Sequence, residues 1–314
     1  MKKVLVTGAE GFIGSHLTES LVRQGFDVRA LVMYNFESSE GWLNSCPTDI
    51  RNSIEVVHGD IRDGSSVLDY VQGRDAVLHL AALIGIPYSY KAPQSYIETN
   101  VLGTLNLLQA SLRCGIQRFV HTSTSEVYGS AQYVPIDESH PLSAQSPYAA
   151  SKVAADQLVL SYHKTFEIPA GIIRPFNTYG PRMRVNDGRV LPAFISQAIR
   201  GEGLTVFGDG SQTRSFCYVD DLVEGIYRLL LSDYHLPVNI GNPDEVTIKK
   251  FGEEILELVG NPKAKLIYKE LPVDDPKKRK PDITLAGKVL DWQPQVTRAD
   301  GLKITLKYFE EVLK

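Results

Sequence analysis

The chain has 314 residues, of which 43% are hydrophobic and 22% charged, and its formal net charge at pH 7 is −4. This balance excludes a general nucleic-acid binder, which carries a basic excess, and no apolar run approaches the ~20 residues that a membrane-spanning helix needs. The three cysteines, Cys46, Cys114 and Cys217, form no Cys-X-X-Cys or Cys/His cluster, so neither a disulfide framework nor a metal site is predicted, and the cytoplasm is the expected compartment.

The N-terminal half alternates short apolar runs with segments of helical periodicity. Strands alternating with helices predict right-handed crossovers and parallel pairing, hence an α/β fold with a Rossmann-type doubly wound parallel sheet. The predicted strands are residues 2–8, 27–32, 54–60, 75–82 and 118–124, with a further strand and loop within 169–180, and the predicted helices include 11–25, about 93–114 and 147–165.

The regular alternation loosens after about residue 180, where "GPRMRVNDGRV" and "FGDGSQTRSF" are rich in glycine and charge. We therefore predict a nucleotide-binding Rossmann domain at 1–180 and a smaller C-terminal substrate-binding lobe at 181–314. The chain is expected to cross back to the core near 215–245. Neither a clean linker nor an internal repeat separates the two parts.

A glycine-rich motif, "TGAEGFIG", directly follows the first predicted strand and opens a helix. Its glycines, Gly8, Gly11 and Gly14, have the spacing GxxGxxG. Glycines in this position let backbone N–H groups approach a pyrophosphate, and the helix N-terminus adds a favourable dipole. The context favours dinucleotide binding over an ordinary turn.

Two polar clusters follow. Tyr148 and Lys152 lie four residues apart on one helix face, and a nearby ammonium favours the phenolate, so Tyr148 could act as a base. Thr124, Ser125 and Glu126 follow the strand "RFVHTS", at the edge where open α/β sheets bind ligands. A surface Tyr–Lys pair, and a helix-capping Thr124 beside a solvated Glu126, are the alternatives that these residues alone leave open.

Taken with those clusters, the chain resembles the extended short-chain dehydrogenases/reductases of the nucleotide-sugar epimerase/dehydratase family. The resemblance implies that Tyr148 deprotonates a sugar hydroxyl at C4 while hydride leaves to a nicotinamide. It covers nearly the whole chain in the family's order, through "TGAEGFIG", "HGDIRD", "LHLAA", "TNVLGT", "STSEVYG", "SPYAASK", "RPFNTYGPR", "VFGDGSQTRSFCYVDD" and "KKRKPDI".

The residue type at position 126 differs between subfamilies of that family that catalyse different reactions, and this chain has Glu126. Simple 4-epimerases that resemble this chain usually carry a small or hydroxyl residue there. In 4,6-dehydratases the carboxylate removes the C5 proton and the C6 hydroxyl leaves as water, whereas in UDP-glucuronate decarboxylases it assists loss of the C6 carboxylate. The resemblance implies a nucleotide-sugar 4,6-dehydratase, with UDP-glucuronate decarboxylase and 4-epimerase as alternatives.

The two halves of the chain resemble different subfamilies. "AALIGIPYSYKAPQSYIETN" and "SPYAASK" resemble UDP-N-acetylglucosamine 4,6-dehydratases of the legionaminic-acid type, whereas "NDGRVLPAFISQAIRGEG" and "DDPKKRKPDI" resemble the decarboxylases. The segments around the reacting carbon carry more weight, because the site determines the chemistry. Ser125 departs from dTDP-glucose dehydratases, which have an acidic Asp there, so Glu126 is expected to act both as base and as acid.

The expected cofactor is NAD. The second strand ends at Val32 or Met33 without the acid that usually binds the ribose, yet the segment from Ala30 to Ile50 has no Lys or Arg for a 2′-phosphate, and Arg29 is expected in mid-strand. NADP therefore stays open. The resemblance implies cofactor contacts from Gly8, Gly11, Phe12, Ile13, Gly14, Asp60, Ile61, Leu80, Ala81, Ala82, Asn100 and Lys152.

The substrate implied by the resemblance is a nucleotide-diphosphate sugar. Arginines read a diphosphate bidentately, and the expected substrate contacts are Asn177, Arg189, Val190, Arg214 and Arg279. The helices at about 93–114 and 147–165 show more apolar surface than one sheet face needs, so we expect a homodimer with a four-helix interface. A non-catalytic dinucleotide-binding regulator and a simple oxidoreductase are the alternatives from other functional classes.

Overall fold

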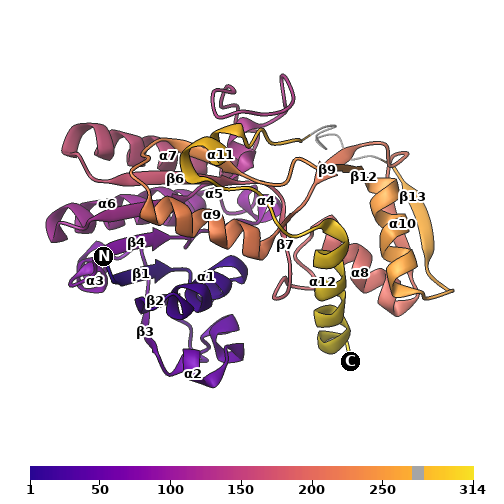
Figure 1. The fold of residues 1–314 in the computed structure, drawn as a ribbon, viewed down its shortest axis with the longest axis horizontal. Coiled ribbons are helices and arrows are strands. Elements are labelled where there is room, and N and C mark those ends of the chain that lie inside the picture. Colours follow the sequence, from indigo (N-terminus) through magenta and orange to yellow (C-terminus); the bar gives the residue numbers. More distant parts are fainter. Residues whose placement is uncertain (271–278) are drawn as a thin grey trace.

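The computed structural model describes residues 1–270 and 279–314. Residues 274–278 of the motif "DDPKKRKPDI" therefore lie outside the described residues. The strands are β1 (Lys3–Thr7), β2 (Asp27–Met33), β3 (Ile54–Gly59), β4 (Ala76–His79), β5 (Arg118–Thr122), β6 (Ala170–Pro175), β7 (Thr178–Tyr179), β8 (Gly203–Phe207), β9 (Thr213–Ser215), β10 (Cys217–Tyr218), β11 (Pro237–Ile240), β12 (Glu245–Thr247) and β13 (Lys265–Lys269) (Figure 1).

Most of the helices lie between these strands, two follow β13, and the longest of the described helices, α7, has twenty residues. Among residues 1–270 and 279–314, no helix combines the length and the apolar composition that a membrane span requires. The helices are α1 (Phe12–Arg23), η1 (Gly41–Ser45), α2 (Thr48–Arg51), α3 (Gly64–Val71), α4 (Ile86–Ser89), α5 (Pro93–Tyr96), η2 (Ile97–Leu102), α6 (Gly103–Cys114), η3 (Ser125–Tyr128), α7 (Pro147–Phe166), α8 (Val190–Arg200), α9 (Val219–Leu231), α10 (Ile248–Val259), α11 (Thr284–Leu290) and α12 (Arg298–Val312).

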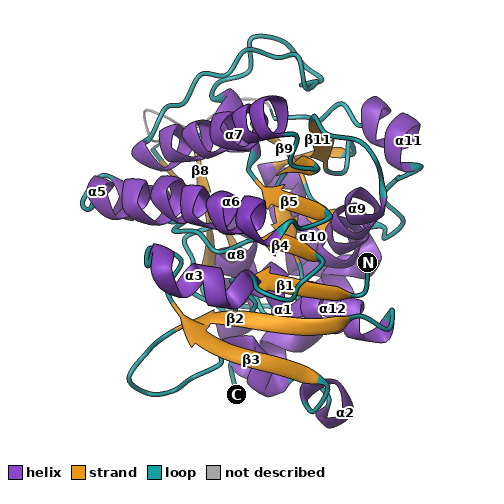
Figure 2. Cartoon of the chain, turned by 90° about the vertical axis from the view of Figure 1, so that its left-hand side faces the viewer, coloured by secondary structure: helices purple, strands orange, loops and turns teal. Residues whose placement is uncertain are grey.

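Seven strands form the central sheet, in the order β11-β6-β5-β4-β1-β2-β3, and every pairing in it is parallel. Helices cover both faces: α3, α6 and α7 pack in a row on one face, and α1 packs on α9 on the other (Figure 2). Because both faces are covered, strand interiors such as "VLV" in β1 are continuous apolar runs. The predicted Rossmann-type doubly wound α/β fold is confirmed.

The strand order reverses at β1, which pairs with β2 on one side and with β4 on the other. In open α/β sheets the ligand crevice lies beyond the carboxyl ends of the strands at this switch point. Thr7 at the end of β1 pairs in register with His79 of β4, and His79 pairs with His121 of β5. The glycine-rich motif, residues 80–82 and residues 123–126 therefore start from one edge of the sheet.

A smaller lobe follows β7. It combines α8, α10 and α12 with the parallel pair β8–β13 and the antiparallel pair β12–β9 (Figure 1). Phe216 and Phe251 stack inside it with their ring centroids 4.3 Å apart. Between β10 and β12 the chain returns to the core, where α9 packs on β5 and β6 and β11 pairs with β6 through Val238 and Ile173.

The helix that the sequence predicts over 93–114 is interrupted. A π-helical turn, η2, separates α5 from α6, and such turns are rare and frequent at functional sites. The first residue of α6 is Gly103. A larger residue would not fit there, because a Cβ at this position would lie 2.5 Å from the side chain of Ile61. The π turn carries Asn100, whose side chain is almost wholly buried.

Candidate active site

The glycine-rich motif forms a cradle that excludes side chains. Gly8 has a φ of +69°, and a Cβ there would lie 2.8 Å from the backbone of Ala81. A Cβ on Gly14 would collide with the carbonyl oxygen of Gly8, and the N–H of Gly11 donates to that same oxygen at 3.1 Å. Helix α1 then begins at Phe12 with no side-chain cap. The cradle fits a pyrophosphate at a helix N-terminus.

Buried hydrogen bonds hold this cradle from below. The hydroxyl of Thr7 accepts from the backbone N–H of Leu80 at 3.2 Å and of Ala81 at 3.1 Å, and it bonds Nδ1 of His79 at 2.8 Å. Nε2 of His79 continues the chain to Thr104 at 3.0 Å. Burial lowers the pKa of His79 to about 3, so this histidine is neutral and serves as a structural link.

Asn100 joins the loop after β4 to α7, the helix that carries Tyr148 and Lys152. Its Oδ1 accepts from the N–H of Leu83 at 2.8 Å, and its Nδ2 donates to the carbonyl of Leu83 and to Oγ of Ser151, both at 2.9 Å. The amide is therefore engaged by the protein itself. It positions the loop after β4 against α7, a role that its membership in a family motif did not reveal.

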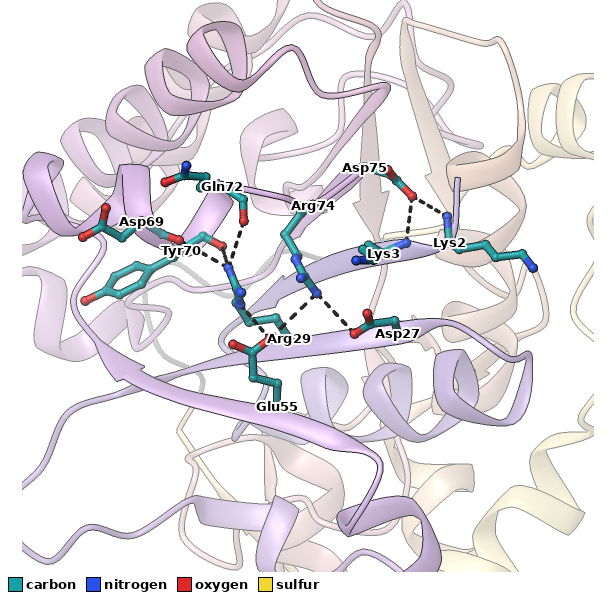
Figure 3. Close-up of polar contacts among 10 residues, drawn as sticks. All are labelled: Lys2, Lys3, Asp27, Arg29, Glu55, Asp69, Tyr70, Gln72, Arg74 and Asp75. Atoms are coloured by element: carbon teal, nitrogen blue, oxygen red, sulfur yellow. Dashed lines mark hydrogen bonds and ion pairs between the residues drawn. The ribbon is translucent and has the colours of Figure 1, made fainter.

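The adenosine side of the expected cofactor site lies beyond β2 and β3. Asp60 forms an ion pair with Arg62, and hydrogen bonds from Arg62 hold the pKa of Asp60 below its usual range. Arg29 lies in the middle of β2, as expected, and its guanidinium donates to the carbonyls of Tyr70 at 2.9 Å and Gln72 at 3.1 Å (Figure 3). These bonds turn Arg29 away from the end of β2.

Thr124, Ser125 and Glu126 follow β5 as the sequence predicts. Thr124 caps the short helix η3, because its hydroxyl accepts the N–H of Glu126 at 3.2 Å. Thr124 and Ser125 are buried, and the Glu126 side chain is 26% exposed. The capping interpretation of Thr124 is therefore correct, and the same hydroxyl lowers the pKa of Tyr148.

Tyr148 lies in the first turn of α7. Ser146 caps this helix by accepting the N–H of Ala149 at 3.1 Å, and Pro147 takes the first helical position. The Tyr148 ring is 7% exposed and meets the ring of Tyr96 edge to face, with centroids 6.2 Å apart. Burial raises the pKa of Tyr148 above its usual range, and the hydrogen bond with Thr124 opposes that rise.

Lys152 lies one turn further along α7, but its ammonium contacts β5. Its Nζ donates to the carbonyl of Thr122 at 2.8 Å and lies 3.4 Å from Nε2 of His121. Burial lowers the pKa of Lys152 to about 8. The sequence predicted that Lys152 lowers the pKa of Tyr148. In the folded protein the effect of burial is larger, so the pKa of Tyr148 is raised instead.

Buried charged side chains lie next to Lys152, and we did not predict them from the sequence. Asp156 lies one turn after Lys152, pairs with Arg174 of β6 at 3.1 Å, and lies 3.6 Å from Nε2 of His121. Arg174 also donates to the hydroxyl of Tyr128 at 3.0 Å. The signal available in the sequence was the spacing Tyr148, Lys152, Asp156, which places three polar groups on one face of a helix.

Glu126 binds a residue from the far end of the chain. Nη1 of Arg279 donates to Oε1 of Glu126 as a close ion pair, and Arg279 is 6% exposed. A bridge between Ile136 and Pro281 holds this segment in place, and Oγ of Ser215 donates to the carbonyl of Arg279 at 3.2 Å. The sequence predicted a diphosphate contact for Arg279, whereas the structure places its guanidinium on the carboxylate.

The remaining expected substrate contacts line the lobe side. Nδ2 of Asn177 is buried and finds no hydrogen-bond partner in the described part of the chain, so a ligand oxygen would satisfy this donor. Arg189 precedes Val190, the first residue of α8, and donates to the carbonyl of Thr178 at 3.3 Å. Arg214, in β9, donates to the preceding carbonyl at 2.8 Å.

Arg189 spans the cofactor and catalytic sides. Its guanidinium carbon lies 5.9 Å from the centre of the Phe12 ring, in the first turn of α1. It also forms an ion pair with Asp187, and its charge lowers the pKa of Tyr148, against the stronger effect of burial. No group of three His, Cys, Asp or Glu side chains in the described ranges could hold a metal ion.

Known proteins match this chain in sequence over almost all of it. The family model for GDP-mannose 4,6 dehydratase matches residues 5–305. UDP-glucuronic acid decarboxylase 6 of Arabidopsis thaliana is 42% identical over 308 residues, which are 96% of this chain and 87% of that protein. UDP-glucuronic acid decarboxylase 1 of Xenopus tropicalis is 38% identical over 100% of this chain and 73% of its own length.

Solved structures also match it in three dimensions. UDP-glucose 4-epimerase from Thermotoga maritima, with UDP-glucose, has a TM-score of 0.92 at 28% identity and covers 99% of this chain and 100% of its own. DesIV from Streptomyces venezuelae, a dTDP-glucose 4,6-dehydratase with NAD bound, has a TM-score of 0.89 at 32% identity, covering 98% and 97%. The chain belongs to the GDP-mannose 4,6-dehydratase family of nucleotide-sugar enzymes.

Proposed function

We propose that the chain is an NAD-dependent nucleotide-sugar 4,6-dehydratase. The observation that carries the proposal is the placement of a carboxylate, Glu126, two residues after Thr124, whose hydroxyl accepts the Glu126 N–H and lowers the pKa of Tyr148. A tyrosine alone serves chemistry at C4. A carboxylate beside it supplies a second proton-transfer group, which the neighbouring C5 requires.

Each side chain then has a defined task. Tyr148 takes the proton of the C4 hydroxyl, and the Thr124 hydroxyl favours the ionised phenol. Lys152 places a positive charge at the end of β5. NAD, when bound in the Gly8–Gly14 cradle, accepts a hydride and later returns it. Structures of related enzymes support this cofactor, because DesIV and the UDP-glucuronic acid 4-epimerase of Bacillus cereus were both solved with NAD.

Glu126 acts at the neighbouring carbon. A ketone at C4 acidifies the C5 proton, and Glu126, whose Oε1 pairs with Arg279, can take that proton on Oε2. Ser125 is a poor acid, so the same carboxyl then protonates the departing C6 hydroxyl. Arg279 compensates the negative charge of the carboxylate between these steps.

UDP-glucuronate decarboxylation is the second candidate, and a specific observation favours it. The curated relatives at 40–42% identity are UDP-glucuronic acid decarboxylases. Arg279 gives that reaction a structural basis, because a buried guanidinium could exchange Glu126 for a sugar carboxylate. The dehydratase is preferred because the segments around Tyr148 and after β4 resemble dehydratases.

A panel of nucleotide sugars distinguishes these reactions. The protein would be incubated with NAD and, separately, with UDP-N-acetylglucosamine, dTDP-glucose, GDP-mannose and UDP-glucuronate, and the product masses recorded. Loss of one water supports the dehydratase. Loss of carbon dioxide from UDP-glucuronate would show that the protein is a decarboxylase, and an isomer of unchanged mass would show that it is an epimerase.

Glu126→Gln tests the role of the carboxylate. The variant keeps the size of the side chain but removes the base, so turnover should fall by roughly 10²–10⁴, and exchange of the C5 hydrogen with deuterated water should stop. Glu257→Gln, at an exposed position of α10, is the matched control and should exchange as the unmodified enzyme does. Normal C5 exchange in Glu126→Gln would contradict the assignment.

The assembly and the compartment complete the proposal. We propose a homodimer through η2, α6 and α7, because Ile97, Leu102, Leu112 and Phe166 keep 42–49% of their surfaces exposed on these elements.

The lobe after residue 180 is proposed to bind the nucleotide diphosphate, and the buried Nδ2 of Asn177, which has no partner among the described residues, supports this. Three unpaired cysteines are consistent with the cytoplasm.

A further inference from the structure

Glu10 lies inside the glycine-rich motif, between Gly8 and Gly11. Its carboxylate does not point into solvent along the loop. Oε1 accepts the backbone N–H of Met33, the last residue of β2, at 2.9 Å. The glycine loop thereby places a carboxylate at the end of the second strand.

The end of β2 has no acid of its own. NAD-binding Rossmann domains usually carry one there, and it holds the hydroxyls of the adenosine ribose. Here the strand ends at Val32 and Met33, and Val32 is fully buried. Glu10 therefore stands, through its bond to Met33, where the strand would otherwise have placed its acid.

The second oxygen of Glu10 is without a donor. Oε2 is buried and has no hydrogen-bond partner within residues 1–270 and 279–314, and a buried polar atom in this state costs free energy until a donor satisfies it. The backbone fixes the residue, because the N–H of Trp42 donates to the Glu10 carbonyl at 3.1 Å. The neighbouring Met33 side chain is 48% exposed, so this strand end is open to a ligand.

The nearest cation of the strand is committed elsewhere. Arg29 donates to the carbonyls of Tyr70 and Gln72 at the end of α3 and pairs with Glu55 at 3.0 Å (Figure 3). It is thus held by the protein rather than offered to a 2′-phosphate. A carboxylate at the strand end accepts hydrogen bonds from two hydroxyls and repels a phosphate.

We infer that Glu10 binds the adenosine-ribose hydroxyls of NAD and sets the preference for NAD over NADP. The inference rests on the proposed function for its cofactor alone. In this chain the glycine loop would recognise the adenosine ribose, which an acid at the end of the second strand usually does. Glu10 would thereby favour NAD over NADP, a preference that the sequence alone left open.

Cofactor binding by the purified protein tests this without any sugar. Dissociation constants for NAD, for NAD lacking the adenosine 2′-hydroxyl, and for NADP would be measured by titration calorimetry. For Glu10→Gln we expect NAD to bind about 10- to 100-fold more weakly, the range of one charge-assisted hydrogen bond. The variant should discriminate less between NAD and its 2′-deoxy analogue, and less against NADP.

Gln retains an acceptor for the Met33 N–H, so the fold should persist, and an unchanged thermal unfolding midpoint verifies this. Glu37→Gln, which removes the same charge from an exposed position of the loop after β2, should bind all three cofactors as the unmodified protein does. Unchanged NAD affinity and discrimination in Glu10→Gln would overturn the inference. Normal NAD binding without any sugar product would instead overturn the proposed function and leave Glu10 in its role.

Discussion

The side chain of Tyr148 is buried, and the Thr124 hydroxyl lowers its pKa; the proposed reaction begins when Tyr148 takes the proton of the C4 hydroxyl. Tyr148→Phe removes the phenol hydroxyl while the ring still packs on Tyr96. Turnover should fall by roughly 10²–10⁴, with NAD affinity and unfolding midpoint unchanged. Tyr90→Phe, at a side chain that is 57% exposed, should turn over normally. A folded Tyr148→Phe with full activity would remove Tyr148 from the mechanism.

Lys152 gives the folded protein a pH signature. Burial lowers its pKa from 10.5 to about 8, so between pH 8 and 10 the unfolded chain binds a proton that the folded chain has released. The free energy of unfolding therefore gains a contribution as pH rises through this window, on the order of 3 kcal/mol at most. Urea titrations at pH 7, 8, 9 and 10 should show the unmodified protein gaining stability relative to Lys152→Met. A constant difference would contradict a buried, depressed lysine.

At the scale of the element, the first turn of α1 depends on the absence of a side chain. Gly14→Ala would place a Cβ against the carbonyl oxygen of Gly8, so we expect a loss of about 1–3 kcal/mol in stability together with weaker NAD binding. Gly287→Ala in α11 is the matched control, because its nearest neighbour would be 3.8 Å away. It should be neutral or slightly stabilising. Urea denaturation and calorimetric titration with NAD provide both readouts.

Elements with local signals were predictable, and those that depend on distant contacts were not. The apolar runs and the glycines located α1, α7 and six strands of the seven-stranded sheet, but they did not predict β11, the strand at one edge of it. The π turn within residues 93–114 escaped detection, because it depends on Asn100 reaching Leu83 and Ser151. The ion pair of Glu126 with Arg279 spans 153 positions, and contacts between distant segments, the bridge from Ile136 to Pro281 and the bond from Ser215 to the Arg279 carbonyl, bring the two together.

The whole molecule should assemble in pairs. Sedimentation velocity at micromolar concentration should give twice the chain mass of 34.8 kDa. Ile97→Asp, on the proposed interface, should shift the protein toward single chains, whereas Ile304→Asp, at a similarly exposed site on α12, should not. Single chains in the unmodified protein would refute the homodimer, and equal effects of both variants would place the interface elsewhere.

The position of β11 has a consequence for how the protein is made. This outer strand of the sheet comes from residues 237–240, although its neighbour β6 is complete at residue 175. During synthesis the edge of β6 therefore stays unpaired while the ribosome adds more than sixty further residues. An unpaired strand edge can form hydrogen bonds with other chains and so promote aggregation. Truncated chains ending before residue 237 should aggregate, and the nascent enzyme should depend on chaperones until β11 closes the sheet.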